Sequence, residues 1–292
     1  MSTADVAMEK ATAPDLISAG VDVGSSSVKI AILRTAGHDD VQTLVLRTER
    51  IRRRDLRKVI QEGYEVALRD AGLASGDVAY VASTGEGELV EFRRGHFYGM
   101  TTHARGARFL VPQACAVLDV GALHARALRI DGRSRVLENR MTSQCASGSG
   151  QFLENVARYL GVALEDVGML SCRATKPELV SSICAVLAET DVINMVSRGI
   201  SIPDILKGIH LSMADRYVRL LRSIGAQGCV CVTGGLAADV GLVQALQEKA
   251  QEQALDLEMH VHLQSIYAGA LGAALWGAYR HRVLARRAEP SA

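Results

Sequence analysis

Aromatic side chains are scarce in this sequence of 292 residues, since Phe, Trp and Tyr together make up 4% of it. Proteins that bind single-stranded nucleic acid stack the bases on aromatic rings, so this scarcity argues against such a platform. An excess of one charge is also lacking: Lys and Arg number 33, Asp and Glu 32, and the formal net charge is +1. Without a positive field, a general binder of nucleic acid or of membrane surfaces is not expected.

Long hydrophobic runs are absent as well. The longest is Tyr267 to Tyr279, thirteen residues, whereas a membrane-spanning helix needs roughly 20. The start of the chain, residues 1–15, carries Asp5, Glu9 and Asp15 and no apolar core, so it does not resemble a signal peptide. We therefore expect a soluble, cytoplasmic protein with a disordered lead-in over residues 1–15.

What is present is typical of a globular protein. Hydrophobic residues make up 48% and charged residues 22% of the chain. At roughly 150 residues per domain, the length predicts about two domains. In a cytoplasmic chain cysteines are not expected to form disulfides, and most should be small core residues. The sequence contains six: Cys115, Cys145, Cys172, Cys184, Cys229 and Cys231.

The first part of the chain alternates in a way that predicts strands followed by a helix. Residues Ile17 to Leu33 are apolar except for a polar turn at Asp22 to Ser27, which predicts two strands joined by a hairpin. A third strand is expected at Val41 to Leu46. A helix is expected at Leu56 to Ala71, and a further strand at Val78 to Ala82.

The same order then starts again, with Asp119-Val120-Gly121 in the place that Asp22-Val23-Gly24 has in the first unit. We therefore predict an internal duplication. The expected elements of the second unit are strands at Ala116–Asp119, Arg126–Ile130 and Arg135–Asn139, helices at Gln151–Leu160 and Pro203–Ile224, a strand at Cys229–Val232, and helices from about Asp239 and from Tyr267.

The fold class expected from this order is α/β, with two similar βββαβα-like halves. The expected division is 1–15 as the lead-in, 16–113 together with 267–287 as the first half, and 114–266 as the second half. His96 and His103 are expected in a polar loop, without a role.

Four short motifs have the chemistry of a phosphate site. In Asp22-x-Gly24-Ser25-x-Ser27 the glycine permits close approach of backbone N–H groups, the hydroxyls add donors, and the carboxylate can hold Mg²⁺. An ordinary Gly/Ser hairpin turn has the same sequence, so one motif alone is weak. The others are Asp119-Val120-Gly121, Thr233-Gly234-Gly235 between a strand and a helix, and the Ala/Gly-rich stretch 267–274.

In this order the motifs resemble the superfamily of sugar kinases, heat-shock proteins and actin. The resemblance implies that two halves close around ATP and Mg²⁺ and that the last helix returns to the first half. It implies catalytic roles for Asp22 and Asp119. The residues that it implies for nucleotide binding are Gly24, Ser25, Ser26, Ser27, Lys29, Gly121, Gly234, Gly235 and Gly269.

Two cysteines stand just before predicted helices. Cys145 lies in a Ser/Gly-rich segment that precedes the helix at Gln151, and Cys184 lies at what resembles another helix start. A helix N-terminus stabilises a thiolate and makes it a better metal ligand, although a single cysteine in either place is more often a buried structural thiol. A [4Fe–4S] cluster needs about four thiolates. Two chains would supply them, so these cysteines are a reason to expect a dimer.

The stretches 143–154 and 182–193 look like the BadF/BadG/BcrA/BcrD-type ATPase family, which activates 2-hydroxyacyl-CoA dehydratases and forms the ATPase module of benzoyl-CoA reductase. The resemblance runs from about Ala19 to Tyr279. It implies a [4Fe–4S] cluster that bridges two subunits and is bound here by Cys145 and Cys184. It also implies an enzyme, in which ATP hydrolysis drives a low-potential electron from reduced ferredoxin to a second protein component.

One departure from the family pattern narrows the resemblance. Activators carry Asp-x-Gly-Gly-x-Asp in the second phosphate turn, whereas this chain has Ala122 and His124 at the second glycine and the last aspartate. Whether the chain's own site hydrolyses ATP is therefore an open question. Residues 121–124 and 141–145 look most like the smaller, D-type members of the family. Such members imply a larger A-type ATPase subunit as partner, and two reductase subunits that bind benzoyl-CoA.

Two alternatives remain from the sequence. A small-molecule kinase of the same fold needs a carboxylate base beside its substrate hydroxyl, but the second turn offers His124 instead, and no sugar-binding motif stands out. A homodimeric dehydratase activator is the other alternative, and the Ala122 and His124 departures argue against it.

Other features receive simpler interpretations. Cys229-Val230-Cys231 on a strand, and also Cys115 and Cys172, are expected in the core. The segment Arg47 to Lys58 holds seven basic and two acidic residues. Such a run of charges usually forms a solvated surface. The more specific alternative is that this surface docks an acidic ferredoxin.

Overall fold

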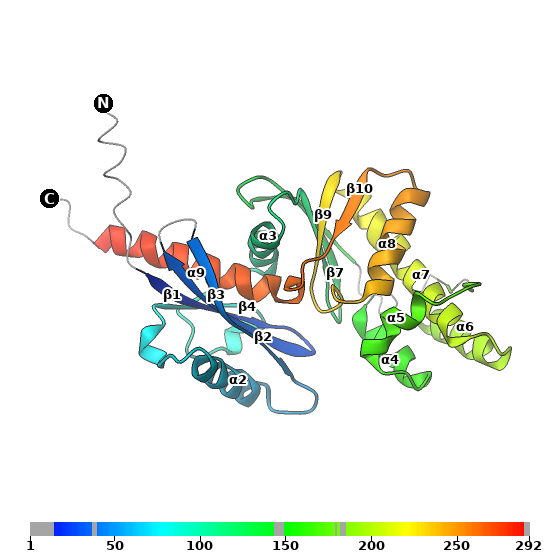
Figure 1. Cartoon of the computed structure of the whole chain (residues 1–292), viewed down its shortest axis with the longest axis horizontal. Helices are drawn as coiled ribbons and strands as arrows, with labels where there is room; N and C mark the ends of the chain where they lie inside the picture. The colour runs from blue at the N-terminus through cyan, green and yellow to red at the C-terminus, as the bar shows by residue number, and fades with distance from the viewer. Residues whose placement is uncertain (1–14, 37–39, 143–148, 179, 182–184, 289–292) are drawn as a thin grey trace.

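Two five-stranded sheets form the framework of the molecule. The computed structural model describes residues 15–36, 40–142, 149–178, 180–181 and 185–288, so the predicted lead-in over residues 1–15 lies outside the described residues except for Asp15. The strand order is β3-β2-β1-β4-β5 in the first sheet and β10-β9-β6-β7-β8 in the second. Figure 1 shows the sheets next to each other, with α3 and α9 near their junction. No helix in the described part is long and apolar enough to cross a membrane.

The first sheet contains the hairpin that the sequence predicts. Its strands are β1 (Leu16–Val23), β2 (Ser27–Ala36), β3 (Asp40–Arg50), β4 (Tyr80–Gly85) and β5 (Gly95–His96). Strand β1 pairs with β2 antiparallel and with β4 parallel. Strand β3 continues to Arg50, beyond the predicted end at Leu46, so part of the basic run lies on a strand.

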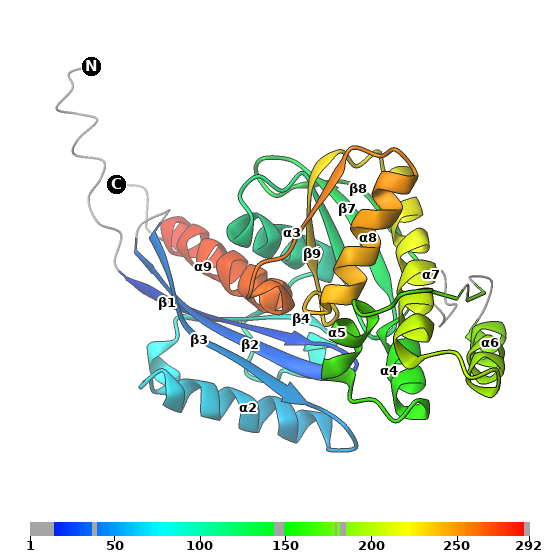
Figure 2. The same ribbon diagram turned by 45° about the vertical axis from the view of Figure 1, so that its right-hand side comes forward.

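A helix covers each face of this sheet. Helix α2 (Leu56–Asp70) begins at Asp55, whose carboxylate accepts the Lys58 N–H as an N-cap. It packs on the face that carries Val21, Val23 and Ile30. The other face, with Ala31 and Leu33, packs against α9 (Ala268–Ala288). Figure 2 shows α2 and α9 on opposite sides of the sheet. This alternation follows from the two-residue period of a strand.

The second sheet repeats the pattern, since β6 pairs with β7 antiparallel and with β9 parallel. Its strands are β6 (Ala116–Val120), β7 (Ala125–Ile130), β8 (Val136–Met141), β9 (Gly228–Thr233) and β10 (Leu257–His260). The helices of this half are α4 (Gly150–Tyr159), α5 (Val167–Ser171), α6 (Ala185–Ser197), α7 (Ile202–Ser223) and α8 (Val240–Glu252). Short 3-10 turns complete the chain at η1 (Ser75–Asp77), η2 (Gly87–Leu89), η4 (Leu164–Asp166) and η5 (Ser265–Tyr267). The predicted duplication is thus visible in the sheet topology.

Helix α3 (Gly99–Leu110) corrects the expectation that His103 lies in a polar loop. The helix buries Thr102, His103, Ala104, Gly106 and Ala107. Because none of these is a large apolar side chain, the hydrophobic periodicity that predicts an amphipathic helix is missing. His103 is consequently a buried helical residue, 7% exposed.

Helices α3 and α9 cross with their backbones in direct contact. A Cβ atom built on Gly106 would lie 1.9 Å from the Ala268 carbonyl oxygen, and one on Gly272 would lie 1.8 Å from the Thr102 carbonyl oxygen. Strand β1 approaches α9 as closely, because a Cβ on Gly20 would lie 1.9 Å from the Ala270 carbonyl oxygen. Only glycine fits at these positions. The small residues of α9 therefore allow α3 and β1 to pack closely against this helix.

This crossing predicts a large difference between two Gly→Ala substitutions. Gly272→Ala should lower the free energy of unfolding by at least about 3 kcal/mol, the upper end of ordinary overpacking, because the obstructing atoms belong to the backbone. Gly76→Ala, with no atom within 4 Å of its added Cβ, should change it by less than about 0.5 kcal/mol. Denaturant unfolding measures both, and equal midpoints for the two variants would show that the crossing is not tightly packed.

Candidate functional site

The two Asp-Val-Gly turns have the same geometry in the two halves. The Gly24 N–H donates to the Ser27 carbonyl at 3.1 Å, and the Gly121 N–H donates to the His124 carbonyl at 2.9 Å. Each bond closes a hairpin after a strand that carries the aspartate. The departure at Ala122 and His124 therefore leaves the backbone of the second turn intact.

The two aspartates converge on one side chain, His103. The Nε2 atom of His103 lies 4.0 Å from Asp22 Oδ2, and its Nδ1 atom lies 3.5 Å from Asp119 Oδ1. The same Nδ1 is within hydrogen-bond distance of Thr233 Oγ1, at 3.0 Å. Strands β1, β6 and β9 and helix α3 each contribute one of these four residues. The structure thus brings Asp22 and Asp119, for which the sequence implies catalytic roles, to a common point between the halves.

Glycines surround the two carboxylates. A Cβ atom on Gly269 would lie 2.4 Å from Asp22 Oδ2, and one on Gly234 would lie 2.5 Å from Asp119 Oδ1. Gly85 and Gly234 have φ angles of +68° and +87°, in the region that favours glycine. Side chains at these positions would fill the space beside the carboxylates. The site is therefore a cradle of backbone and carboxylate oxygens, which are ligands that Mg²⁺ prefers.

Lys29 supplies a cation beside the first turn. It lies opposite Asp22 in the β1–β2 register and is 8% exposed. A Cβ atom on Gly24 would lie 3.6 Å from its Nζ, and among the described residues no carboxylate forms an ion pair with it. Ser25 and Ser26, at the tip of the same turn, are exposed. A buried lysine and the exposed hydroxyls of the turn are a donor set suited to a phosphate.

The loop after β9 lies against the second turn. The Leu236 N–H donates to the Val120 carbonyl at 3.2 Å, which places Gly234 beside that turn while Gly235 is exposed. Helix α4 begins on the same turn, because the Gly150 N–H donates to the Gly121 carbonyl at 3.1 Å and the Gln151 N–H donates to the Ala122 carbonyl at 2.8 Å. The second turn is thus bonded to the first residues of the helix that follows the Cys145 segment.

Cys145 and Cys184, the predicted cluster ligands, lie outside the described residues. The two helices that follow them, α4 and α6, are described and border a common pocket. The pocket is lined by Asn155, Val156, Tyr159, Glu189, Val192 and Ile193. Two cysteine-bearing segments that lead into adjoining helices suit a shared metal group, because each helix N-terminus favours a thiolate. Within the described residues, no group of three or more His, Cys, Asp or Glu side chains could hold a metal ion.

The remaining cysteines divide into two kinds. Cys229 and Cys231 are buried in the core on the α3 side of the second sheet, as expected. Burial raises the pKa of the Cys231 thiol to about 12, so this side chain is not a thiolate near neutral pH. Cys115 and Cys172 are exposed, so the expectation that they belong to the core is wrong. Cys115 lies in the connection that precedes β6, and Cys172 directly follows α5. Both therefore lie outside the apolar interior.

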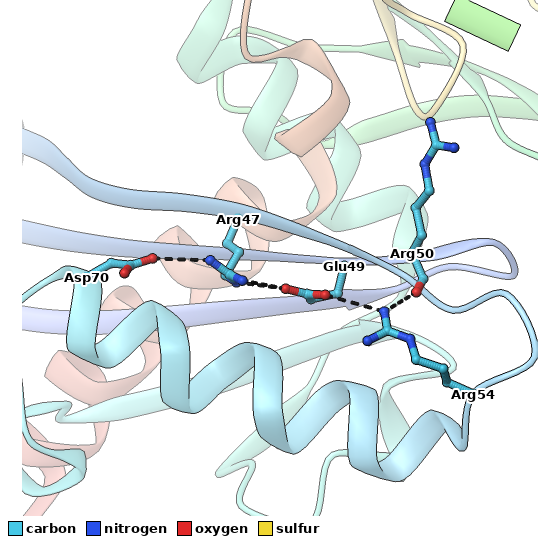
Figure 3. A network of polar contacts seen from close by, with 5 residues as sticks. All are labelled: Arg47, Glu49, Arg50, Arg54 and Asp70. Carbon is cyan, nitrogen blue, oxygen red and sulfur yellow. Dashed lines mark hydrogen bonds and ion pairs between the residues drawn. The ribbon is translucent and has the colours of Figure 1, made fainter. Parts of the chain in front are cut away.

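The basic run is partly neutralised by neighbouring carboxylates. Arg47 contacts Glu49 at 2.6 Å and Asp70 at 3.3 Å, and Arg54 contacts Glu49 at 3.3 Å. These contacts link the end of β3 to both ends of α2 (Figure 3). The Arg50 carbonyl accepts a hydrogen bond from Arg54, whereas the Arg50 side chain extends away from the network in Figure 3 and forms no ion pair with a described residue. Arg57 forms an ion pair with Glu91. The arginines of the run that remain for a partner are therefore Arg50, Arg52 and Arg53.

The Arg50 backbone is also paired with the first phosphate turn. Arg50 lies opposite Ser27 in the β2–β3 register, and the Ile51 N–H donates to the Ser26 carbonyl at 3.0 Å. The unpaired part of the basic run consequently adjoins the candidate site.

Comparisons with known proteins agree with this geometry. The family model described as "BadF/BadG/BcrA/BcrD ATPase family" matches residues 19–277. The chain is 60% identical over 271 residues to the D-type subunit of benzoyl-CoA reductase from Thauera aromatica, and the match covers 92% of this chain and 96% of that protein. It is 34% identical over 258 residues to "Activator of lactoyl-CoA dehydratase" of Anaerotignum propionicum, covering 88% and 95%.

Solved structures agree on the fold. The activator of the 2-hydroxyisocaproyl-CoA dehydratase from Clostridium difficile, with bound ADPNP, superimposes with a TM-score of 0.83 at 28% identity, covering 95% of this chain and 100% of that one. A ROK family glucokinase from Streptomyces griseus shares the fold alone, with a TM-score of 0.55 at 12% identity and coverage of 90% and 99%. The predicted α/β fold of the actin and sugar-kinase type is confirmed.

The site predicts a specific effect of removing one charge. Asp22→Asn should weaken binding of Mg²⁺–ATP by at least about 10-fold, since loss of even an outer-sphere partner has that effect on a metal site. Asp166→Asn is the matched control, because Asp166 is exposed in η4. Calorimetric titration with and without Mg²⁺ measures the change. If Asp22→Asn binds Mg²⁺–ATP as tightly as the control does, Asp22 does not belong to the site.

The free arginines predict a second effect. If they dock an acidic electron donor, replacing Arg50, Arg52 and Arg53 together by Ala should slow electron transfer several-fold at low salt and much less at high salt, because screening weakens steering. Stopped-flow oxidation of reduced ferredoxin at two ionic strengths measures this. Unchanged electron-transfer rates at low salt would show that the basic run is an ordinary solvated surface and does not dock the donor.

Proposed function

The chain belongs to the BadF/BadG/BcrA/BcrD ATPase family, and from this membership we propose that it is the D-type ATPase subunit of an ATP-dependent benzoyl-CoA reductase. In this role it couples ATP hydrolysis by the ATPase module to transfer of a low-potential electron from ferredoxin. The electron serves the reductive dearomatisation of benzoyl-CoA in anaerobic degradation of aromatic compounds.

The observation that carries the proposal is the 60% identity to a D-type benzoyl-CoA reductase subunit along 92% of the chain. That length includes both phosphate turns and both cysteine segments. The dehydratase activators are matched at 31 to 34% identity over a similar length. Because the fold is shared by both groups, the difference in identity is what favours the reductase.

The nucleotide site of the proposal is the cradle between the halves. Mg²⁺–ATP would be held by Asp22 and Asp119, with Lys29 and the hairpin of Gly24, Ser25, Ser26 and Ser27 on the phosphates. On the second half, Gly121, Gly234 and Gly235 would adjoin the nucleotide, and Gly269 lies against Asp22. The intact backbone of the second turn supports nucleotide binding by this chain, with Ala122 and His124 in place.

A [4Fe–4S] cluster is the second cofactor of the proposal. Cys145 and Cys184 would supply two of its four thiolate ligands and a partner ATPase subunit the other two, and the cluster would carry single electrons at low potential. The adjoining helices α4 and α6 support this assignment. Exposed apolar side chains on these helices, Tyr159, Ile193 and Val196, support a partner surface nearby.

A bonded connection joins the two cofactor sites of the proposal. The second phosphate turn accepts two backbone hydrogen bonds from the first residues of α4. A displacement of this turn on nucleotide binding would therefore be passed to the helix that follows Cys145. The environment of the cluster sulfurs sets its potential, so nucleotide state and electron delivery can be linked through α4.

The proposed assembly contains a larger A-type ATPase subunit and two reductase subunits that bind benzoyl-CoA, with reduced ferredoxin as donor. No nucleic acid or membrane takes part. Within this chain we propose the division into residues 16–113 with 267–287 and residues 114–266, because each part contains one of the two sheets.

The second candidate is a homodimeric activator of a 2-hydroxyacyl-CoA dehydratase. It is favoured by the superposition on a dehydratase activator with a TM-score of 0.83. The kinase alternative has only the shared fold in its favour.

One reconstitution separates these candidates. This chain, co-expressed anaerobically with a larger A-type ATPase subunit and the two reductase subunits, should reduce benzoyl-CoA only when both ATP and a low-potential donor are present. Size-exclusion chromatography should place it in a hetero-oligomer. A chain that forms a homodimer in the presence of the A-type subunit, and that activates a dehydratase component instead, would favour the second candidate.

A further inference from the structure

His103 is a buried titratable side chain on the element that connects the two halves. Helix α3 follows the last strand of the first sheet and precedes β6, the first strand of the second. The side chain is 9% exposed, and it lies between carboxylates that belong to different halves. The proposed function leaves it without a role.

The two ring nitrogens face different carboxylates. Nε2 is directed to Asp22 of β1, at 4.0 Å, and Nδ1 to Asp119 of β6, at 3.5 Å. The rigid imidazole therefore stands between the two oxygens. Because no bond inside the ring rotates, the imidazole keeps the two carboxylates from closing on each other.

The ring itself is fixed in place. Thr233 Oγ1, fully buried at the end of β9, lies 3.0 Å from Nδ1. On the Nε2 side, Gly269 leaves no room for another group, because a Cβ atom there would lie 2.8 Å from Nε2 and 2.4 Å from Asp22 Oδ2. His103 is consequently held by β9 on one side and by the first turn of α9 on the other.

His103 also lies at the crossing of the two connecting helices. Its neighbour Thr102 contacts Gly272, and Gly106, one turn further along α3, contacts Ala268. These close backbone contacts fix the part of α3 that carries His103 against the first turns of α9.

We propose that His103 is a positioning residue, which holds the carboxylates of Asp22 and Asp119 apart and orients them to bind one nucleotide-bound Mg²⁺ directly or through its waters. This inference rests on the nucleotide site of the proposed function. Outer-sphere partners that orient metal-binding carboxylates influence metal affinity by about 10- to 100-fold. His103 acts through the two aspartates and need not touch the nucleotide.

The test compares three variants of the complete complex. In His103→Asn the amide lies near the position of Nδ1 and can keep the Thr233 and Asp119 contacts. In His103→Gln the amide lies near the position of Nε2 and can keep only the Asp22 side. His103→Ala keeps neither. His260→Gln is the control, since His260 lies on the edge strand β10 and its contact is with Glu258.

The measurement is photoaffinity labelling with an azido analogue of ATP, with and without Mg²⁺, at increasing concentrations. Electrophoresis separates this chain of 31.2 kDa from the larger A-type subunit, so the label reports this site alone. In the wild type and the control, Mg²⁺ should increase the apparent affinity. His103→Ala should lose about 10- to 100-fold of that increase, as expected for an outer-sphere partner. His103→Asn should retain most of the increase. Without Mg²⁺, the apparent affinity of every variant should remain within about 3-fold of the wild-type value.

Three results would overturn the inference. One is a full Mg²⁺ effect in His103→Ala, and another is an equal loss of labelling with and without Mg²⁺, which indicates a structural role only. The third is wild-type labelling that does not respond to Mg²⁺. Benzoyl-CoA reduction by the same preparations is measured separately. If it is absent while the variants behave as expected, the proposed function fails and the role of His103 stands.

Discussion

The direct backbone contact between α3 and α9 is the constraint on which the rest of the structure depends. It requires glycine at Gly106 and Gly272, and it joins α3, which packs on the second sheet, to α9, which packs on the first. The same crossing brings His103 from α3 and Gly269 from α9 against Asp22. A duplicated chain has two equivalent aspartates, but they form one site only because the connecting helices hold the halves together at the ends of β1 and β6. Packing of small residues is thus what creates the candidate nucleotide site.

Much of the fold follows from ordinary sequence patterns. The long helix α7 is predicted from the period of its apolar side chains, and the hairpin around Asp22 and the strand β9 are predicted from apolar runs beside turn residues. The topology confirms the duplication. Helix α3 was not predictable in this way, because its buried face consists of Ala, Gly, Thr and His. The exposed positions of Cys115 and Cys172 also escaped prediction, since free cysteine is usually buried and nothing in these two segments marked the exceptions. The two phosphate turns of the site were predicted from the sequence. His103 was not, because only the tertiary structure brings it next to the aspartates.

The arrangement connects three parts of the molecule in sequence. The crossing helices position the carboxylates, the second phosphate turn lies at the end of the strand that carries Asp119, and that turn is hydrogen-bonded to the beginning of α4. The proposed cluster ligands precede α4 and α6 along the chain. An ATPase that delivers electrons needs such a connection, because its nucleotide and its redox group must respond to each other. The departures at Ala122 and His124 lie on the same turn, yet they preserve its hydrogen bonds and hence the connection.

The central claim, that this ATPase is an electron-transfer subunit, is tested most directly by iron and acid-labile sulfide in the anaerobically purified complex. We predict about 2 Fe per ATPase chain, as for one four-iron cluster shared by two subunits. Cys145→Ser and Cys184→Ser should each lose that iron, whereas Cys172→Ser, at an exposed position, should retain it. A folded complex that binds ATP without iron, or that keeps its full iron content in both variants, would contradict the account.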